Sequence, residues 1–505
     1  MNQQKFTILL IMCLLSLGLQ AQKKKRILLK GADLMISESR AGQDISILRG
    51  NVIFEHDTAM LFCDSAYMYD ATNSLDAFGN VRVKLNDSLN LYGDVLFYDG
   101  NLRLAEVHQN VRLVDRSSTL YTQHMYYDRV IRRGHYPDSG RIVDGENILT
   151  SKLGYYYSDR REYLFRDNVI LTNPDYVMRS DTLVYNTQSK TAFIHSPTTI
   201  TGKEKHMYAE KGWYNTHLDI SKLRKNVFIQ NKDRTLKADS IFYREDGKYA
   251  RAYSRVVMHD TTKNIFLKGD FAEYFERNGY TYVTDSAQAI FVEKSDTLYM
   301  HADTLRLTFD STKTARKFYA FNGVRFYRTD LQGISDSLVW TYSDSTVNMY
   351  GLPVIWSDEH QLTSDSIRMF INNQKIDSML MFNSAFIIQM DDSNSFNQVK
   401  GRNMKGYFND GKIYRFDVKG NAETVYYVRE EDKSLTGINL VISSNMRIVV
   451  EKNEITDIFY YQNPEGATYP ETEFPADKKK LQGFKWYGEL RPLDRHDIFR
   501  QAPKP

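Results

Sequence analysis

The segment LKADSIFY, from Leu236 to Tyr243, decides the fold, because a recognisable version of it recurs about every 29 residues. When the copies are aligned on Asp239, the equivalent anchor positions are Asp64, Asp94, Gln123, Lys152, Asp181, Glu210, Asp239, Asp270, Asp303, Asp336, Asp365 and, more loosely, Arg402 and Ile438. Five consecutive steps between these anchors are 29 residues long. Self-similarity at one fixed period predicts stacked repeats rather than unrelated domains.

The columns around the anchor describe one repeat. The residue before the anchor is small in every copy, as in Cys63 and Gly93, and the residue three before it is a large aliphatic in all copies but one. The position four after the anchor is Tyr from Tyr98 to Tyr274 without a break. A second motif, Asn-Val, stands about thirteen residues before many anchors, as in Asn110-Val111.

The apolar positions change phase at the anchor. Positions −3 and −1 alternate as in a strand, and so do +2 and +4, but the second pair is shifted by one residue. Such a shift would turn the later side chains to the other face, so a bend or bulge at Asp-Ser/Thr is predicted. We expect each repeat to be a coil of two or three short strands, apolar inside and polar outside, in an elongated stack roughly 60–120 Å long.

The composition agrees with many amphipathic strands. The chain has 505 residues with 35 Tyr, 27 Phe and only 10 Pro, and 66 Lys+Arg against 63 Asp+Glu give a net charge of +3. Aromatic-rich, proline-poor chains with balanced charge favour β-structure over disorder or a helical membrane bundle. The two cysteines, Cys13 and Cys63, exclude a disulfide framework and a multi-cysteine metal site.

Residues 1–21 are typical of a cleaved signal peptide. Lys5 precedes the apolar run from Phe6 to Leu19, and Ala21 provides a small residue for cleavage. The run is shorter than the roughly 20 residues that a membrane-spanning helix needs, although anchoring by an uncleaved segment stays open. We therefore expect an exported protein in which Cys63 is the remaining cysteine, buried as a small apolar residue of the −1 column.

The chain shows no recognisable catalytic or metal-binding motif. The histidines form no HExxH pair, and GxSxG and phosphate-binding loops are absent from the sequence. The anchor aspartates are interpreted as turn residues, because Gln123, Lys152 and Arg402 occupy the same column. We predict no enzyme activity, no catalytic residues, no cofactor and no metal. Lys and Arg are interspersed with acidic residues, so nucleic-acid binding is not predicted either.

Residues 446–505 depart from the repeat pattern. They contain Pro464, Pro470 and Pro475 and the segment LQGFKWYGELRP, from Leu481 to Pro492. The sequence leaves two interpretations open: an extension that caps the repeats, or a segment that docks on a partner.

The repeats resemble a known family. The strands GNVIF from Gly50, GNVRV from Gly79 and KNVFI from Lys225, together with ADSIFY from Ala238, resemble the OstA-like family over roughly residues 27–445. This is the organic-solvent-tolerance domain shared with the LptA-like bridge proteins of lipopolysaccharide transport. Length and the C-terminal segment are similar to long OstA-like proteins of the Bacteroidetes type. The resemblance implies an all-β, taco-like β-jellyroll with open ends, in one or more stacked domains, whose apolar interior holds acyl chains.

The resemblance also implies a site, partners and a location. The lipid-binding candidates are inward aliphatics of the −3 and +2 columns: Leu96, Leu120, Met178, Leu183, Leu236, Ile241, Leu267, Met300, Leu305, Leu338, Leu362 and Ile367. The implied partners are lipopolysaccharide or a related acylated lipid, other transport proteins paired through edge strands, and further copies joined end to end. The implied location is the periplasm, with an association with the inner or outer membrane left open.

Two other functions are compatible with the repeats. One is a structural β-solenoid scaffold whose interior is filled by its own side chains, which the many inward tyrosines favour. The other is a polysaccharide-processing enzyme, which would need a cluster of acids, Arg or His on one outer face, and the sequence identifies no such cluster. The volume of the interior distinguishes the scaffold from the lipid carrier.

Overall fold

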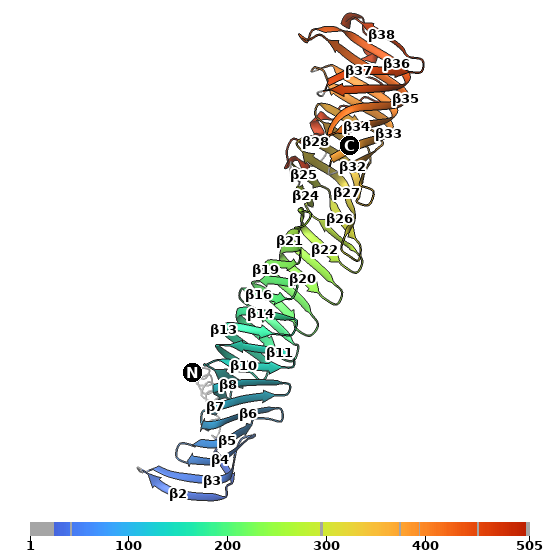
Figure 1. Ribbon diagram of the computed structural model, residues 1–505. Helices are drawn as coiled ribbons and strands as arrows, with labels where there is room; N and C mark the ends of the chain where they lie inside the picture. The colour runs from blue at the N-terminus through green and yellow to red at the C-terminus, as the bar shows by residue number, and fades with distance from the viewer. Residues whose placement is uncertain are drawn as a thin grey trace, which may run out of the picture. The chain divides into compact units, whose positions relative to one another are not determined.

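The structure is a computed structural model that describes residues 25–40, 43–292, 296–372, 375–392, 394–451 and 454–500. The predicted signal segment, residues 1–21, lies outside the described residues. The chain divides into two compact units: residues 1–203 with 210–217 form unit 1, and residues 204–209 with 218–505 form unit 2. Both units consist of antiparallel strands that follow one another in chain order (Figure 1).

The strands of unit 1 are β1 (Leu28–Gly31), β2 (Leu34–Arg40), β3 (Gln43–His56), β4 (Ala59–Tyr69), β5 (Ser74–Lys84), β6 (Leu89–Asp99), β7 (Leu104–Asp115), β8 (Ser118–Asp128), β9 (Arg133–Tyr136), β10 (Gly140–Asp144), β11 (Asn147–Ser151), β12 (Leu153–Tyr157), β13 (Glu162–Thr172), β14 (Tyr176–Asn186), β15 (Thr191–Ile194), β16 (Thr198–Gly202) and β18 (Lys211–Asn215).

Unit 2 contains β17 (Lys205–Ala209), β19 (Ile220–Asn231), β20 (Arg234–Arg244), β21 (Tyr249–Asp260), β22 (Ile265–Phe275), β23 (Tyr280–Thr284), β24 (Gln288–Val292), β25 (Thr297–His301), β26 (Thr304–Phe309), β27 (Ala315–Arg328), β28 (Leu331–Thr341), β29 (Thr346–Tyr350), β30 (Val354–Ser357), β31 (His360–Thr363), β32 (Ser366–Asn372), β33 (Lys375–Met390), β34 (Phe396–Asn409), β35 (Lys412–Arg429), β36 (Leu435–Glu451), β37 (Glu454–Tyr461) and β38 (Glu465–Tyr469).

One repeat is a pair of long strands joined by tight turns. In unit 1, β6 pairs with both β5 and β7 in antiparallel register, and the chain continues in the same way through β8. The all-β prediction is therefore confirmed. Where strands continue through the bend, as in β5 and β6, two strands of about eleven residues replace the expected short ones. Where they end at the bend, as in β9–β12, the repeat consists of the expected short strands of four or five residues.

The bend lies where the phase change predicted it. In β6 the buried positions are Leu89, Leu91 and Gly93 before the anchor Asp94, and Leu96 and Tyr98 after it. The strand therefore bends at Asp94, so that the apolar side chains before the bend and those after it both face the interior. We call the halves that carry the −3 and −1 columns the first wall, and the halves that carry the +2 and +4 columns the second wall.

The neighbouring strand supplies the extra residue at each corner. The register of β5 against β6 shifts between Phe78 and Val81, and the two residues Gly79 and Asn80 have left-handed φ angles of 74° and 43°. Such a pair is a β-bulge, which bends the strand and increases its twist. The side-chain amide of Asn80 donates a hydrogen bond of 2.8 Å to the anchor Asp64.

The same corner recurs along unit 1. Asn110 has φ 51° and donates to the anchor Asp94 at 2.6 Å, and Asn51 donates to Asp33 at 2.9 Å. Asn tolerates left-handed backbone better than most residues and its amide can reach the carboxylate. The Asn-Val motif and the aspartate column are therefore two halves of one corner, and the interpretation of the anchors as turn residues agrees with these contacts.

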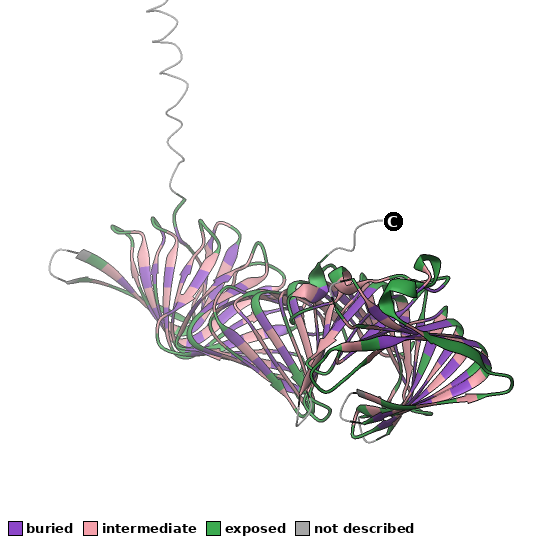
Figure 2. Ribbon diagram, turned by 90° about the horizontal axis from the view of Figure 1, so that it is seen from above, coloured by how far each residue is buried: buried purple, intermediate pink, exposed green. Residues whose placement is uncertain are grey.

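Buried side chains line the inside of both walls. Along the strands, buried and less buried residues alternate, and exposed residues lie at the turns (Figure 2). The tyrosine column contributes to the interior: Tyr127, Tyr156 and Tyr185 are at most 3% exposed. Cys63 is also buried as predicted, and burial raises the pKa of its thiol to about 12.

The C-terminal segment begins later than the loss of the repeat pattern at residue 446. Strands β36 to β38 continue the antiparallel pairing as far as Tyr469. The chain then forms four 3₁₀ turns, η1 (Glu471–Glu473), η2 (Ala476–Lys478), η3 (Gly488–Leu490) and η4 (Asp497–Phe499), and packs Phe474 and Leu481 against the core of unit 2. No helix of the described residues is long and apolar enough to cross a membrane.

Candidate functional site

The predicted lipid-binding residues form rows on the two facing walls. The −3 residues Leu120, Met178, Leu236, Leu267, Met300 and Leu362 lie on the first wall, and the +2 residues Leu96, Leu183, Ile241, Leu305, Leu338 and Ile367 lie on the second. Eleven of the twelve are buried, and Leu236 is half-buried. The structure therefore arranges them as two linings rather than one compact site, and their contact with lipid stays a prediction.

The interior of unit 1 is filled by its own side chains near its N-terminal end. An enclosed cavity there, lined by residues that include Phe54, Leu75 and Leu96, has a volume of only about 20 Å³. A space of that size holds about one water molecule. An acyl chain would enter this part of unit 1 only if the two walls moved apart.

A line of polar contacts joins the two walls of unit 1 where they meet. We call this line the seam. The hydroxyl of Tyr98, from the second wall, lies 2.6 Å from Nδ1 of His56, from the first wall. Arg129 donates to Tyr98 at 2.7 Å and to the carbonyl oxygen of His56 at 3.0 Å. Burial lowers the pKa of His56, so the neutral ring is favoured in the folded state.

The seam continues with two buried carboxylates. Tyr156 donates to Asp115, and Tyr185 donates to Asp144 at 2.9 Å. Lys190 approaches both carboxylate oxygens of Asp144 at 2.6 and 2.7 Å. Burial is the main cause that raises the pKa of Tyr156 and of Tyr185, so both hydroxyls stay protonated and donate. These hydrogen bonds and the ion pair of Lys190 with Asp144 hold the two walls of unit 1 together.

Unit 2 has equivalent contacts between its walls around β20–β22, and these are more exposed than the seam of unit 1. Lys205 lies over the ring of Tyr243 at 3.4 Å and forms a 3.3 Å ion pair with Glu245, whose side chain is 47% exposed. Tyr243 is only half-buried, whereas the equivalent Tyr156 is fully buried. The wall contacts here are therefore more accessible to water than those at Asp144.

The apolar lining is also most accessible in this part of unit 2. Leu236 of β20 pairs with Met258 of β21, and Met258 pairs with Leu267 of β22. Leu236 and Met258 are half-buried, whereas Leu120, the −3 residue of β8, has no exposed surface. Of the predicted residues, Leu236 is therefore the one that a ligand in the interior reaches most easily.

Sequence reasoning missed the seam. Asp144 and Lys190 lie outside the recurring columns of the repeat, and 46 residues separate them. Their pairing depends on how the walls close, which the repeat period does not encode. A signal was present in Asp115 and Asp144, which both stand at the end of a strand 41 residues before a tyrosine of the +4 column.

Groups suited to metal binding do not gather in the described ranges. Within them, no three His, Cys, Asp or Glu side chains lie close enough to hold a metal ion. At Asp115 and Asp144 the seam joins hydroxyl groups and the ammonium of Lys190 to carboxylates. The distinctive feature of unit 1 is therefore an apolar interior whose two walls are joined by the polar contacts of the seam.

Comparison with known families agrees with the repeat pattern. Residues 23–181 match a family described as OstA-like protein, which confirms the resemblance found in the repeats. No curated protein matches the chain.

Proposed function

We propose that this OstA-like chain is a periplasmic lipid-binding protein of lipopolysaccharide transport, and that it holds acyl chains between the two walls. The observation that carries the proposal is the pair of continuous apolar linings, which become accessible at Leu236 and Met258. The match of residues 23–181 to a family associated with lipopolysaccharide transport supports the same function.

Binding of the acyl chain would depend on hydrophobic burial and would need no chemical reaction. Transfer of an acyl chain from water into an apolar lining stabilises the complex by about 0.8 kcal/mol per buried CH₂. No catalytic group is needed for such binding, and an energised partner elsewhere would drive movement of the lipid. Unpaired edge strands such as β2 and β38 would let the chain join a transport protein or a second copy by adding strand to strand.

A photocrosslinking experiment tests the lipid-binding interior. A photoreactive amino acid at Leu236 should crosslink to lipopolysaccharide or another acylated lipid in cells, because this side chain is half-buried on the inner face. The matched control is the same amino acid at Lys237, which is exposed on the opposite face of the same strand. Equal lipid capture at both positions, or none at Leu236, would refute the proposal.

A second candidate is a scaffold with a filled interior. It is favoured by the cavity of about 20 Å³ near Phe54 and by the fully buried tyrosines of unit 1. Mass spectrometry of the purified mature protein separates the two functions. A copurifying acylated lipid supports the carrier, and its absence together with unchanged assembly in a Leu236→Gln variant supports the scaffold.

A further inference from the structure

The C-terminal segment of unit 2 shows how a stretch of irregular chain binds the outer face of the first wall. The side-chain amide of Gln398 donates to the carbonyl oxygen of Lys479 at 2.8 Å, and its oxygen accepts from the backbone amide of Leu481 at 2.9 Å. Gln361 makes the same two contacts with Lys485 and Tyr487, at 2.8 and 2.7 Å. Each glutamine thus clamps a carbonyl and the amide two residues later.

The glutamines occupy one column of the repeat. Gln332, Gln361 and Gln398 each stand four residues before an anchor, on the face opposite to the −3 leucines. The register places Gln361 and Gln398 two strands apart, with Ile388 between them. Gln332 accepts from Arg491 at 2.8 Å and extends the row. In unit 2 the outer face of this wall therefore binds the backbone of another segment through its glutamine side chains.

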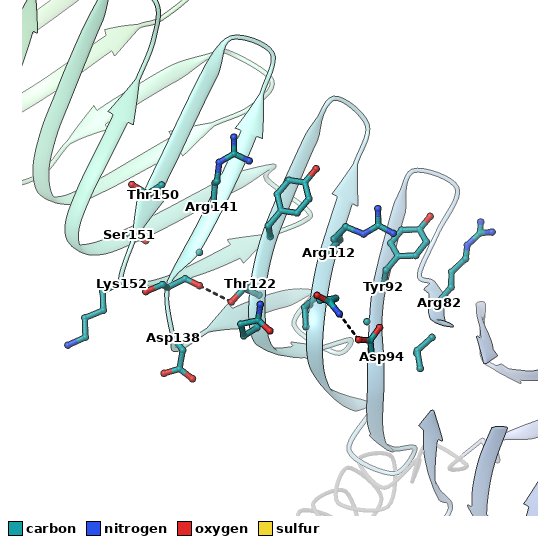
Figure 3. Close-up of a pocket in the computed structure, with 18 of the residues that line it drawn as sticks. Arg82, Tyr92, Asp94, Arg112, Thr122, Asp138, Arg141, Thr150, Ser151 and Lys152 are labelled. Carbon is teal, nitrogen blue, oxygen red and sulfur yellow. Dashed lines mark hydrogen bonds between the residues drawn. The ribbon is translucent and has the colours of Figure 1, made fainter. Parts of the chain in front are cut away.

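The corresponding face of unit 1 carries an open groove. Its volume is about 1230 Å³, and its lining comes from β5–β8, β10 and β11 together with the corner residues (Figure 3). A row of side chains crosses these strands in direct register: Arg82, Tyr92, Arg112, Tyr121, Arg141 and Thr150. This row lies at position −2, next to the −4 row that holds the glutamines in unit 2.

The row is basic and its arginines are exposed. Arg112 lies 5.0 Å from the ring centre of Tyr92, and Arg141 lies 5.9 Å from that of Tyr121. Within the described part of the chain, neither Arg112 nor Arg141 forms an ion pair with a carboxylate. The tyrosine rings support the planar guanidinium groups, and the edges of these groups stay available for bidentate contacts with anions.

The groove keeps an excess of positive charge, because Arg82, Arg112, Arg141 and Lys152 line it together with only two carboxylates, those of Asp94 and Asp138. The anchor Asp94 accepts from Asn110 at 2.6 Å, and Asp138 pairs with His124 at 2.8 Å. Both carboxylates therefore have partners of their own at the corner. The arginines of the row face the groove together with Lys152.

We propose that this groove is a docking site for an extended acidic segment of a partner protein. The contacts of residues 479–487 show that the outer face of the first wall binds polypeptide backbone in unit 2. On the same face of unit 1, the arginine row selects an acidic segment. The part of the C-terminal segment that binds the glutamines does not suit the groove, because residues 478–487 contain Lys478, Lys479, Lys480 and Lys485 and no acidic residue. The proposal concerns the outer face and is independent of the lipid-binding interior.

The spacing of the arginines specifies the segment further. Arg82, Arg112 and Arg141 stand on every second strand, so neighbouring arginines are about 9.6 Å apart. A polyproline II segment advances about 9.3 Å per turn of three residues. An acidic residue at every third position would therefore meet successive arginines from one face of the segment.

Fluorescence anisotropy with the mature full-length chain tests this docking site. The probe is a labelled 15-residue peptide in which the triplet Glu-Pro-Thr is repeated, and the control peptide carries Lys in place of Glu. We expect the acidic peptide to bind and the basic peptide not to bind. The variant Arg82→Gln/Arg112→Gln/Arg141→Gln should weaken binding by about tenfold or more, because it removes three facing charges.

Matched variants separate the groove from general charge. Arg224→Gln/Lys317→Gln/Lys412→Gln removes the same charge from exposed positions elsewhere and should change the affinity by less than about twofold. Replacement of the three groove arginines by lysine should give an intermediate loss, because lysine cannot bind a carboxylate in a bidentate manner. The proposal is overturned if the acidic peptide does not bind, or if both triple glutamine variants behave alike. Tight binding of heparin or of an oligonucleotide through these arginines, without peptide binding, would also overturn it.

Discussion

The contact between Asp144 and Lys190 allows a quantitative test of how unit 1 is closed. Lys190→Met removes the ammonium group but keeps an apolar stem of similar length. The carboxylate of Asp144, whose side chain has no exposed surface, would keep only its hydroxyl partners, which include Tyr185 at 2.9 Å. Breaking a buried ion pair by removing one partner costs about 3–5 kcal/mol. The Lys190 side chain is 31% exposed, so we expect the lower end of that range, about 3 kcal/mol.

Hydrogen exchange measures this loss locally. Repeat proteins need not unfold in one cooperative step, so a global denaturation curve would dilute an effect confined to one seam. A loss of about 3 kcal/mol corresponds to roughly a hundredfold faster exchange of the amides in β14 and β15. Mass spectrometry of peptides that cover Tyr176–Asn186 and Thr191–Ile194 gives the rate directly.

The double variant Asp144→Asn/Lys190→Met is the control. Its amide oxygen still accepts from Tyr185 and no charge is left buried, so most of the lost protection should return. If Lys190→Met changes exchange by less than about threefold, or if the double variant is no better protected than the single one, the seam does not close unit 1 as argued.

Three further predictions concern unit 1. Gly79→Ala should destabilise its corner by about 1–3 kcal/mol, because φ is 74° and a Cβ would lie 2.5 Å from the carboxylate of Asp64. Hydrogen exchange of the amides in β5 should therefore become faster. Gly31→Ala is the control and should have little effect, because no atom lies within 4 Å of its new Cβ. Cys63 should resist labelling by maleimide at pH 8 in the folded protein and react fully in urea, since burial raises its pKa to about 12; fast native labelling would contradict its burial. Burial lowers the folded-state pKa of His56 below its unfolded value near 6.5, so its contribution to stability is present above that pH and decreases as the pH falls further. Protection factors in β3 and β6, which correct for the slower intrinsic exchange at low pH, should therefore fall on acidification, and His56→Gln should flatten that dependence; an unchanged dependence would show that another group titrates.

The periodic part of the fold could be predicted from the sequence because it depends on spacing within one strand. The shift between Gly93 and Leu96 is visible as a change of phase in the apolar pattern, and that change alone predicts the corner at Asp94. The small −1 column and the buried tyrosines follow from the same alternation. The length of strands such as β5 could not be predicted from this alternation, because the bulge at Gly79-Asn80 lets the strand pass through the corner without ending.

The contacts between strands could not be predicted, since they depend on register and on closure of the walls. Arg82, Arg112 and Arg141 are separated by some thirty residues in sequence, among many acidic ones, so their common row was invisible in a linear reading. The same holds for Gln361 and the chain near Tyr487, which are 126 residues apart. The basic cluster on one face exists only because hairpins of nearly constant length repeat the same register.

The seam also bears on where a lipid would enter. Opening unit 1 beside Asp144 would expose a desolvated ion pair and its hydroxyl partners, at a cost of several kcal/mol. Opening unit 2 beside Tyr243 would break the ion pair of Lys205 with the half-exposed Glu245, and such exposed pairs contribute at most about 1 kcal/mol. Burial of two CH₂ groups, at about 0.8 kcal/mol each, offsets that smaller loss, whereas a loss of about 3–5 kcal/mol requires roughly four to six CH₂ groups to be in place first. Access at β20–β22 is therefore the easier route, and it is the route along which Leu236 and Met258 are already partly exposed.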